Sequence, residues 1–283
     1  MTIHASAFAP LYIVATPIGN LEDLTLRALR VLKEVRWIAC EDTRQSRKLL
    51  EHFGITTQMI SYHDHNETSR AEQLVARLEA GEPGALISDA GTPLVSDPGY
   101  RLVSAALAAG ASVIPIPGAC AVVTALSASG LPTDAFRFSG FLPPKSGARR
   151  RALEELKRED CTLIFYETPH RILDALDDVA AVLGNRPVVV ARELTKMHEE
   201  FLRGTAPEVR AVLAARPSVK GEITLLIGKA SSLDPPADGS AGDAEILRDA
   251  VRALEQTGLS RMDAIKRVAR ERGLNKREVY RVV

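Results

Sequence analysis

The sequence predicts an α/β protein made of two α/β domains and a small helical domain at the C-terminal end. Short apolar runs alternate with helical patterns through most of the 283 residues, which is typical of a parallel sheet covered by helices. The alternation pauses at a segment rich in glycine and proline, Gly140-Phe141-Leu142-Pro143-Pro144-Lys145-Ser146-Gly147. After residue 243 the pattern becomes amphipathic and helical only.

These changes give the expected domain boundaries. We expect an N-terminal α/β domain over residues 11–139, a linker over 140–150 and a second α/β domain over 151–230. Residues 231–243 contain Pro-Pro, Gly, Ser and Ala, a composition that favours a flexible tether. Residues 244–283 are expected to form the basic helical domain.

The elements of the two α/β domains are expected in alternation. In the first domain, strands are expected at 11–15, 37–40, 84–87 and 112–116, and helices at about 24–32, 70–80, 100–107 and 118–129. In the second, strands are expected at 161–166, 187–191 and 222–227, and helices at about 148–158, at 169–183 and after residue 205. We expect the second domain to be smaller and mixed in strand direction.

Composition excludes several classes of protein. The formal net charge is zero, so no global field favours a polyanion or a membrane surface, although a local basic patch remains compatible. Cys40, Cys120 and Cys161 form neither a C-x-x-C motif nor a disulfide framework, which suits a reducing cytoplasm. No apolar run approaches the roughly 18 residues of a membrane span, and Met1–Pro10 does not resemble a signal peptide. We therefore expect a cytoplasmic protein without a membrane partner.

The C-terminal segment concentrates positive charge. Residues 261–281 contain eight Lys or Arg and three Asp or Glu. A helix over 244–256, a break at Gly258-Leu259-Ser260 and a second helix capped by Ser260 and running to about Arg272 are similar to a helix-turn-helix. This arrangement favours nucleic-acid contact. The alternative is a solvated helical hairpin that packs on the main body.

One long loop follows a predicted strand of the first domain. It reads Ser88-Asp89-Ala90-Gly91-Thr92-Pro93-Leu94-Val95-Ser96-Asp97-Pro98-Gly99. Open α/β sheets bind ligands at the carboxyl ends of their strands, and glycine lets backbone approach a ligand closely. We expect a binding loop; the alternative is an ordinary strand-to-helix turn. The turn after the first strand, Ala15–Thr25, fits neither G-x-G-x-x-G nor a Walker A motif, which argues against NAD and P-loop ATP binding.

Ionisable groups gather at other predicted strand ends. Cys40–Arg44 and Ser61–Glu67 belong to the first domain, and Tyr166–Arg171 and Ala191–Glu200 to the second. Their spacing matches no metal motif, so we expect no metal; whether they face a substrate or form hydrogen-bonded loops stays open. Together they favour a cleft between the domains. Lys145 and the three residues Arg149 to Arg151 add positive charge suited to phosphate, or form an exposed helix start.

Several of these segments resemble the tetrapyrrole methylase superfamily. The similar segments are Thr16–Asp23, the Ser88–Gly99 loop and Ile116–Ala121. Further segments resemble the branch of that superfamily that methylates ribosomal RNA: Glu41–Arg44, Ser127–Pro132, Gly140–Pro143 and Arg192–Lys196. The resemblance extends from about Leu11 to the end of the chain.

The resemblance implies methyl transfer from S-adenosylmethionine to the ribose 2′-oxygen of a cytidine in the decoding region of 16S ribosomal RNA. It also implies a cofactor cleft between two α/β domains and a homodimer. The residues that it implies at the cofactor are Pro17, Asp89, Ala90, Gly91, Pro93, Val95, Cys120, Ala121, Tyr166 and Thr224. Thr92 stands where porphyrin-type relatives carry Asp, which argues against a tetrapyrrole substrate.

A ribose hydroxyl is a weak nucleophile, so a base should remove its proton as the new bond forms. We hypothesise that Glu41, Asp42 or His63 does so, and that Arg44 or Lys145 holds the adjacent phosphate. Two alternatives remain: a small-molecule methyltransferase that acts on a porphyrin-like ring, and a non-catalytic regulator that binds nucleic acid.

Overall fold

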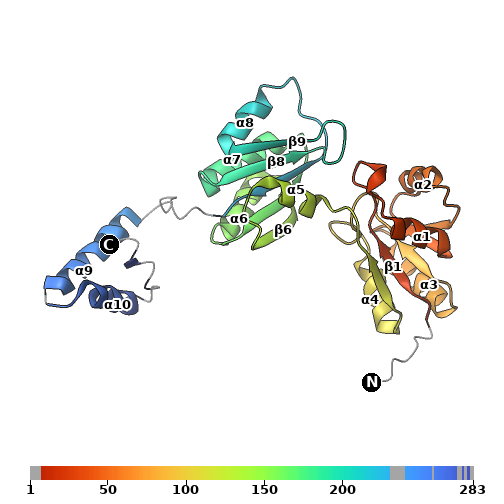
Figure 1. The fold of residues 1–283 in the computed structure, drawn as a ribbon, viewed down its shortest axis with the longest axis horizontal. Helices are drawn as coiled ribbons and strands as arrows, with labels where there is room; N and C mark the ends of the chain where they lie inside the picture. Colours follow the sequence, from red (N-terminus) through yellow and green to blue (C-terminus); the bar gives the residue numbers. More distant parts are fainter. Residues whose placement is uncertain (1–7, 230–239, 257, 273–275, 277–278, 281–283) are drawn as a thin grey trace. The chain divides into compact units, whose positions relative to one another are not determined.

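The computed structural model describes residues 8–229, 240–256, 258–272, 276 and 279–280. The chain divides into two compact units, residues 1–230 and 231–283 (Figure 1). The first unit contains two five-stranded sheets, and the second consists of helices. The predicted α/β fold class is confirmed.

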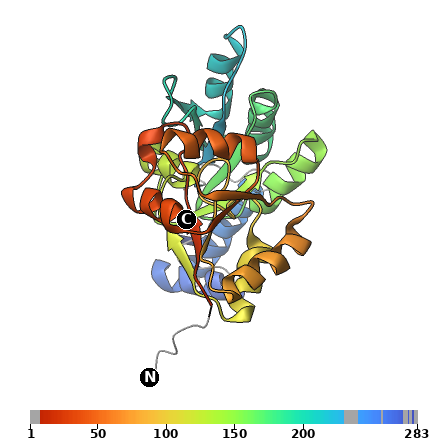
Figure 2. The ribbon, with the colours of Figure 1, turned by 90° about the vertical axis from the view of Figure 1, so that its right-hand side faces the viewer.

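The first sheet is entirely parallel, with strand order β3-β2-β4-β1-β5. Its strands are β1 Leu11–Val14, β2 Trp37–Cys40, β3 Gln58–Ser61, β4 Gly84–Leu86 and β5 Val113–Ile116. Helices α1 (Leu26–Glu34) and α2 (Thr43–His52) pack on one face, whereas α3 (Glu67–Glu79) and α4 (Tyr100–Ala109) pack on the other (Figures 1 and 2). A short 3-10 helix, η1 (Leu21–Asp23), precedes α1.

The second sheet has the order β6-β7-β10-β8-β9 and is mixed, as predicted. Its strands are β6 Phe136–Phe141, β7 Thr162–Glu167, β8 Pro187–Arg192, β9 Glu200–Thr205 and β10 Ile223–Ile227. Only β6 and β7 are parallel neighbours; the other pairs are antiparallel. Helices α6 (Ser146–Leu156), α7 (Ile172–Leu183) and α8 (Ala206–Ala214) bury one face, and α5 (Ala121–Ser129) covers the other.

Some elements differ from the prediction. The segment expected as a linker, residues 140–150, contains the end of β6 and the start of α6. Strands β3, β6 and β9 and helix α2 were not predicted, because polar residues interrupt the apolar pattern in all four segments. Helix α7 begins at Ile172 rather than at residue 169, because Arg171 N–H bonds Thr168 O in a preceding turn (3.1 Å).

The C-terminal unit has a core of its own. Helices α9 (Ser240–Gln256) and α10 (Arg261–Glu271) bury Leu247 and Val251 against Ile265 and Val268. The Ser260 side chain caps α10, as predicted, by accepting a hydrogen bond from Asp263 N–H (3.2 Å). Residues 240–243, expected in the tether, are the first turn of α9, and residues 231–239 lie outside the described part. No helix among the described residues is long and apolar enough to span a membrane.

Candidate functional site

Three loops at the carboxyl edge of the first sheet are joined by hydrogen bonds. Thr16, after β1, forms an isolated antiparallel bridge with Gly91 of the 88–99 loop, with N–H···O distances of 2.8 and 3.0 Å. The buried Thr16 hydroxyl also donates to Ser88 O (3.1 Å). Thr92 Oγ1 donates to Ala119 O (3.1 Å) and so binds the loop after β5. The 88–99 loop is therefore held from both sides.

Backbone strain is concentrated in two loops. The residues other than glycine with positive φ, among those described, are Leu94, Ser96, Glu193 and Thr195. The first two belong to the 88–99 loop and the others to the loop between β8 and β9. Each such residue costs about 1–3 kcal/mol, and strain of this kind clusters at ligand sites. Both loops also border a cavity.

This cavity, which we call the cleft cavity, has a volume of about 310 Å³. That volume lies at the lower end of the range for small-ligand pockets, roughly 300–1,000 Å³. Loops of the first sheet form one wall and strands of the second sheet form the other. The lining residues are Ile18, Ala90, Gly91, Thr92, Val95, Ser96, Asp97, Ala121, Phe141, Tyr166, Glu167, Thr168, Pro169, Ala191, Leu194, Gly221, Glu222, Ile223 and Thr224.

The cleft cavity brings together six of the residues expected at the cofactor: Ala90, Gly91, Val95, Ala121, Tyr166 and Thr224. The last two face each other across β7 and β10, and Thr224 is opposite Ala191 on β8. Three adjacent strands thus present one row of residues to the cavity.

Four expected cofactor residues do not line the cavity. Pro17 lies between the bridging Thr16 and the lining Ile18, and Pro93 is buried within the 88–99 loop. Cys120 is the N-cap residue of α5. Asp89 turns toward β2 instead, where its Oδ1 accepts a hydrogen bond from Asp42 N–H (3.2 Å).

Two ionisable side chains of the cleft cavity have shifted pKa values. Burial raises the pKa of Tyr166 above its ordinary value, and the nearby Cys120, Asp97 and Glu222 add to the effect. Burial also raises the pKa of Asp97, while a hydrogen bond with Ser88 acts in the opposite direction. Asp97 lies in the predicted binding loop 88–99 but was not itself predicted as a site residue. The feature that could have identified Asp97 is that it is a carboxylate within this glycine- and proline-rich segment.

The five residues expected in catalysis lie outside the lining of the cleft cavity. Glu41 and Asp42 follow β2, and His63 follows β3, so the parallel sheet places them at one edge. Burial raises the pKa of Glu41, and Asp89, Asp97, Asp64 and Asp42 raise it further. This edge of the sheet is therefore acidic. Asp97, which lines the cleft cavity, is one of the carboxylates that act on Glu41.

Asp42 and Arg44 bind each other at the surface of the molecule. Asp42 caps α2 by accepting from Arg44 N–H (2.8 Å), and its second oxygen pairs with Arg44 Nη2 (3.0 Å). The hydrogen bond from the Arg44 side chain lowers the pKa of Asp42, and the bond from its backbone acts in the same direction. A phosphate would have to compete with this carboxylate for Arg44.

His63 is oriented by Asn66. The Asn66 side chain accepts from His63 N–H (2.9 Å) and lies 3.2 Å from the ring Nε2. The ring Nδ1 is buried without a hydrogen-bond partner in the described part of the chain. The imidazole is thus held in place by one nitrogen while the other remains unpaired.

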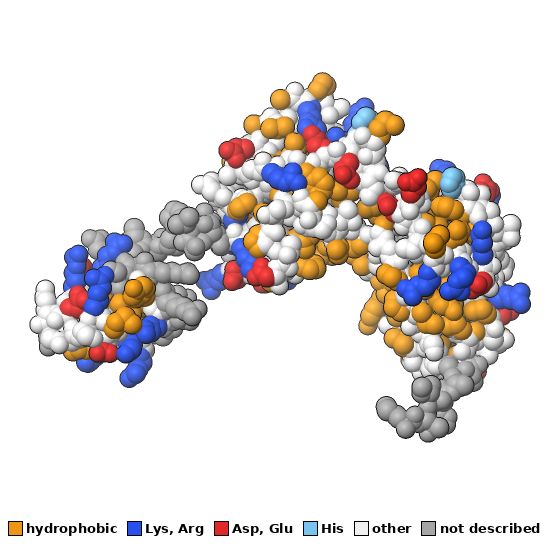
Figure 3. All heavy atoms as spheres, viewed as in Figure 1, with side chains coloured by type: hydrophobic (Ala, Val, Ile, Leu, Met, Phe, Trp, Pro, Cys, Tyr) orange, Lys and Arg blue, Asp and Glu red, His pale blue; other side chains and the backbone are white. Residues whose placement is uncertain are grey.

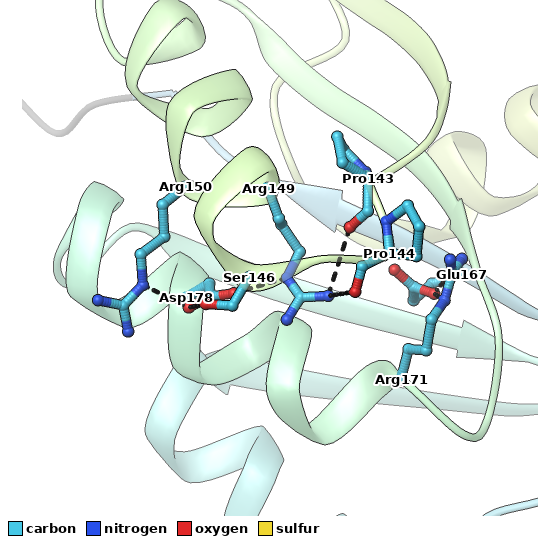
Figure 4. A network of polar contacts seen from close by, with 8 residues as sticks. All are labelled: Pro143, Pro144, Ser146, Arg149, Arg150, Glu167, Arg171 and Asp178. Atoms are coloured by element: carbon cyan, nitrogen blue, oxygen red, sulfur yellow. Dashed lines mark hydrogen bonds and ion pairs between the residues drawn. The ribbon is translucent and has the colours of Figure 1, made fainter.

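The basic cluster beside the expected linker contains both exposed and buried residues, and Figure 4 shows two of its arginines, Arg149 and Arg150, beside Asp178. Lys145 is the exposed N-cap residue of α6. Arg149 is instead 2% exposed and pairs with the 3% exposed Asp178 of α7 (2.6 Å), so its expected availability to phosphate was wrong. Its Nη1 also lies 3.5 and 3.4 Å from the carbonyl oxygens of Pro143 and Pro144. Arg149 therefore fixes the segment that leads from β6 to Lys145.

The β8–β9 loop is held by ion pairs. Glu200 accepts from Arg192 (3.0 Å) and Arg216 (2.5 Å), and Lys196 binds both Glu193 (2.9 Å) and Glu222 (3.0 Å). Gly19 of the first loop approaches this loop so closely that a Cβ there would lie 2.5 Å from Lys196 Cγ. A side chain at position 19 would therefore force Lys196 and Thr195 to shift at this contact between the two halves of the unit.

The C-terminal unit carries exposed basic side chains on α10 (Figure 3). Lys266 and Arg267 pair with Asp263 and Glu271 on the same helix (3.0 Å each). Within the described residues, no carboxylate pairs with the exposed Arg270. No cluster of His, Cys, Asp and Glu suited to a metal ion occurs among the residues that the structure describes.

Comparison with known proteins identifies close relatives. A family profile described as tetrapyrrole (corrin/porphyrin) methylases matches residues 10–210. The ribosomal RNA small subunit methyltransferase I of Halalkalibacterium halodurans is 50% identical over 280 residues, covering 96% of this chain and 93% of the relative. The protein of that name from Synechocystis sp. is 49% identical over 273 residues and covers 96% of both chains.

Solved structures share the fold at lower identity. A uroporphyrin-III-C-methyltransferase from Thermus thermophilus matches with a TM-score of 0.54 and 21% identity, covering 80% of this chain and 96% of that one. A diphthine synthase matches with a TM-score of 0.59 and 14% identity, covering 78% and 90%. At these identities the likeness concerns the fold alone.

Proposed function

Because the chain belongs to the tetrapyrrole methylase family, we propose that it is an S-adenosylmethionine-dependent methyltransferase of small-subunit ribosomal RNA. The observation that carries the substrate class is the identity of about half over nearly the full length of relatives bearing that name. We further propose the ribose 2′-oxygen of a cytidine in the decoding region of 16S RNA as the acceptor.

The cleft cavity fits such a cofactor. Its walls are mainly apolar, its backbone is strained and preorganised, and the half-buried Asp97 carboxylate favours a ligand with a positive charge. S-adenosylmethionine, when bound, supplies a methyl group on a positively charged sulfur. The residues expected to hold it are those that converge on the cavity, from Ala90 and Gly91 to Tyr166 and Thr224.

The acidic edge beside the cavity supplies candidates for proton transfer. Glu41 has a raised pKa and therefore accepts a proton more readily than an ordinary carboxylate does at neutral pH. His63 has an unpaired ring nitrogen at the same edge. We propose that one of these groups, or Asp42, takes the hydroxyl proton. The exposed Lys145 is proposed to hold a neighbouring phosphate; Arg44, paired with Asp42, is the second candidate.

The C-terminal unit is proposed to dock on the ribosomal RNA through phosphate contacts. Replacing both Arg270 and Arg272 by Glu should weaken binding of small subunits. The slope of log K against log salt concentration should become less steep by about 0.7–0.9 for each lost phosphate contact. Cofactor affinity, measured by calorimetry, should not change, because the unit has its own core. The paired Lys266, mutated to Glu, is the control. Loss of cofactor binding in the double variant would instead make the unit a structural cap.

We also propose that the protein acts in the cytoplasm as a homodimer, without a resident metal. The support is the resemblance to the family and the reduced cysteines, of which Cys40 and Cys161 are buried. Sedimentation of the full chain at several concentrations tests the dimer.

The decisive experiment mixes the protein with labelled S-adenosylmethionine and small subunits that lack the modification, and maps the label by nuclease digestion. Label on a single ribose 2′-oxygen supports the proposal in full. Cofactor binding with transfer to a tetrapyrrole and none to RNA would favour the small-molecule alternative. Failure to bind the cofactor at all would favour a non-catalytic regulator.

A further inference from the structure

A second cavity, which we call the β3–α3 groove, lies on the first sheet. It has a volume of about 360 Å³ and shares no lining residue with the cleft cavity. Its lining residues are Gln58, Met59, Ile60, Ser61, Arg70, Gln73, Leu74 and Arg77. Apart from Ser61, which begins the segment Ser61–Glu67 considered above, none of them was selected from the sequence, because they lie in two elements whose individual patterns are ordinary.

One wall of the groove is an edge strand and the other is a helix face. Strand β3 ends the sheet, so one of its backbone edges has no neighbouring strand among the described residues. Arg70, Gln73 and Arg77 are spaced i, i+3 and i+7 on α3 and therefore share one face of the helix. Leu74, which is 1% exposed, packs beneath them. The groove thus has polar, cationic rims over an apolar floor.

The two arginines differ in how they are held. Arg77 pairs with Glu82 (2.6 Å), and its guanidinium lies 5.8 Å from the centroid of the Trp37 ring. Arg70 donates from Nη1 to Gln73 Oε1 (2.9 Å), and no carboxylate within the described residues pairs with it. A guanidinium has five N–H donors, so most of the donors of Arg70 remain for a ligand.

The groove leads toward the acidic edge of the sheet. Its Arg70 end is bonded to the His63 loop, since Arg70 N–H donates to Asn66 O (3.0 Å). The other wall of the groove, strand β3, ends at Ser61, two residues before His63. At 1.5 Å rise per residue, Arg70 and Arg77 are about 10 Å apart along the helix axis. This span corresponds to about three nucleotides of a stacked strand.

We propose that the β3–α3 groove binds the phosphodiester backbone of the RNA substrate beside the reacting nucleotide. This inference rests on the proposed function. Guanidinium groups form strong charge-assisted bonds to phosphate, and Gln58, Gln73 and Ser61 add uncharged donors along the same track. A peptide strand added to β3 would use the backbone edge but would leave Arg70 without an anionic partner, so phosphate is the favoured ligand.

The test is Arg70→Glu in the full chain, with Arg30→Glu as the matched control. Arg30 is an exposed helix residue paired with Glu34 (2.8 Å) on α1, across the sheet from α3. Glutamate in the first turns of α3 is compatible with the helix dipole, so the fold should persist. We expect Arg70→Glu to weaken binding of unmethylated small subunits about tenfold and to lower the salt slope by about 0.7–0.9 for each lost phosphate contact.

Two further measurements separate binding from chemistry. Calorimetric affinity for S-adenosylmethionine should be the same in Arg70→Glu and wild type, and KM for subunits should rise while kcat holds. Arg70→Gln, which removes the charge without reversing it, should give a smaller loss in the same direction. If Arg70→Glu binds subunits as Arg30→Glu does, the groove proposal is wrong. If wild type itself neither binds nor methylates the subunits, the proposed function fails instead.

Discussion

The two walls of the cleft cavity are stabilised by different interactions. The first-sheet wall is joined by backbone and hydroxyl hydrogen bonds around Thr16 and Gly91, without an ion pair among its described members. The second-sheet side depends on charged side chains: Glu200 with two arginines and Lys196 with two glutamates near the cavity, and Arg149 with Asp178 between α6 and α7 on the opposite face of the sheet. The first wall, apart from the half-buried Asp97, should therefore respond little to salt, whereas the ion pairs of the second side should respond to both pH and salt.

The largest expected effect comes from the buried ion pair. Asp178→Asn leaves the charge of Arg149 buried without its partner, because both side chains are at most 3% exposed. Such a loss costs about 3–5 kcal/mol of unfolding free energy, measurable by urea denaturation.

Arg150→Met is its matched control. Arg150 also pairs with Asp178, but its side chain is 54% exposed, and we expect a loss under about 1 kcal/mol. Equal losses in the two variants would contradict the importance of burial for the ion pair between α6 and α7.

The acid response of the second wall gives the next effect. The hydrogen bond from Arg216 lowers the pKa of Glu200 to about 2, below its ordinary value near 4.5. The stabilisation is therefore complete above about pH 4.5 and is lost as pH falls toward 2. Glu200→Gln should cost about 2 kcal/mol near pH 7, and the difference from wild type should shrink as pH falls. A difference independent of pH would refute the assignment.

The first wall should show a smaller and more local effect. Gly91 has φ of +83°, and a Cβ there would lie 3.3 Å from Ile18 Cγ2. Gly91→Ala should cost about 1–2 kcal/mol in stability and should also weaken cofactor binding. Gly110→Ala is the matched control. Gly110 has a similar positive φ (+89°), but no atom lies within 4 Å of a Cβ placed there, and Gly110 does not line the cavity. If both variants bind cofactor alike, the first wall does not shape the site.

The sequence was sufficient for the α/β class, for seven of the ten described strands and for the 88–99 loop, because strand hydrophobicity and turn residues act locally. It missed β3, β6 and β9, whose polar residues interrupt the apolar pattern. The sequence could not distinguish the buried Arg149 from the exposed Lys145, since the burial of Arg149 depends on its ion pair with Asp178, 29 residues away. Six expected cofactor residues meet at one cavity, yet the expected catalytic groups lie beside it rather than in it. Their placement follows from the order of parallel strands, which no local motif encodes.

Helix α5 has a consequence for synthesis of the chain. It precedes every strand of the second sheet in sequence, yet its residues Val122, Ala125 and Leu126 pack against Ile164, Val189 and Leu226. A ribosome therefore releases this apolar face long before β10, its last partner strand, is made. During that interval the nascent chain presents an unfilled hydrophobic surface at residues 121–129, and transiently exposed surface of this kind favours aggregation.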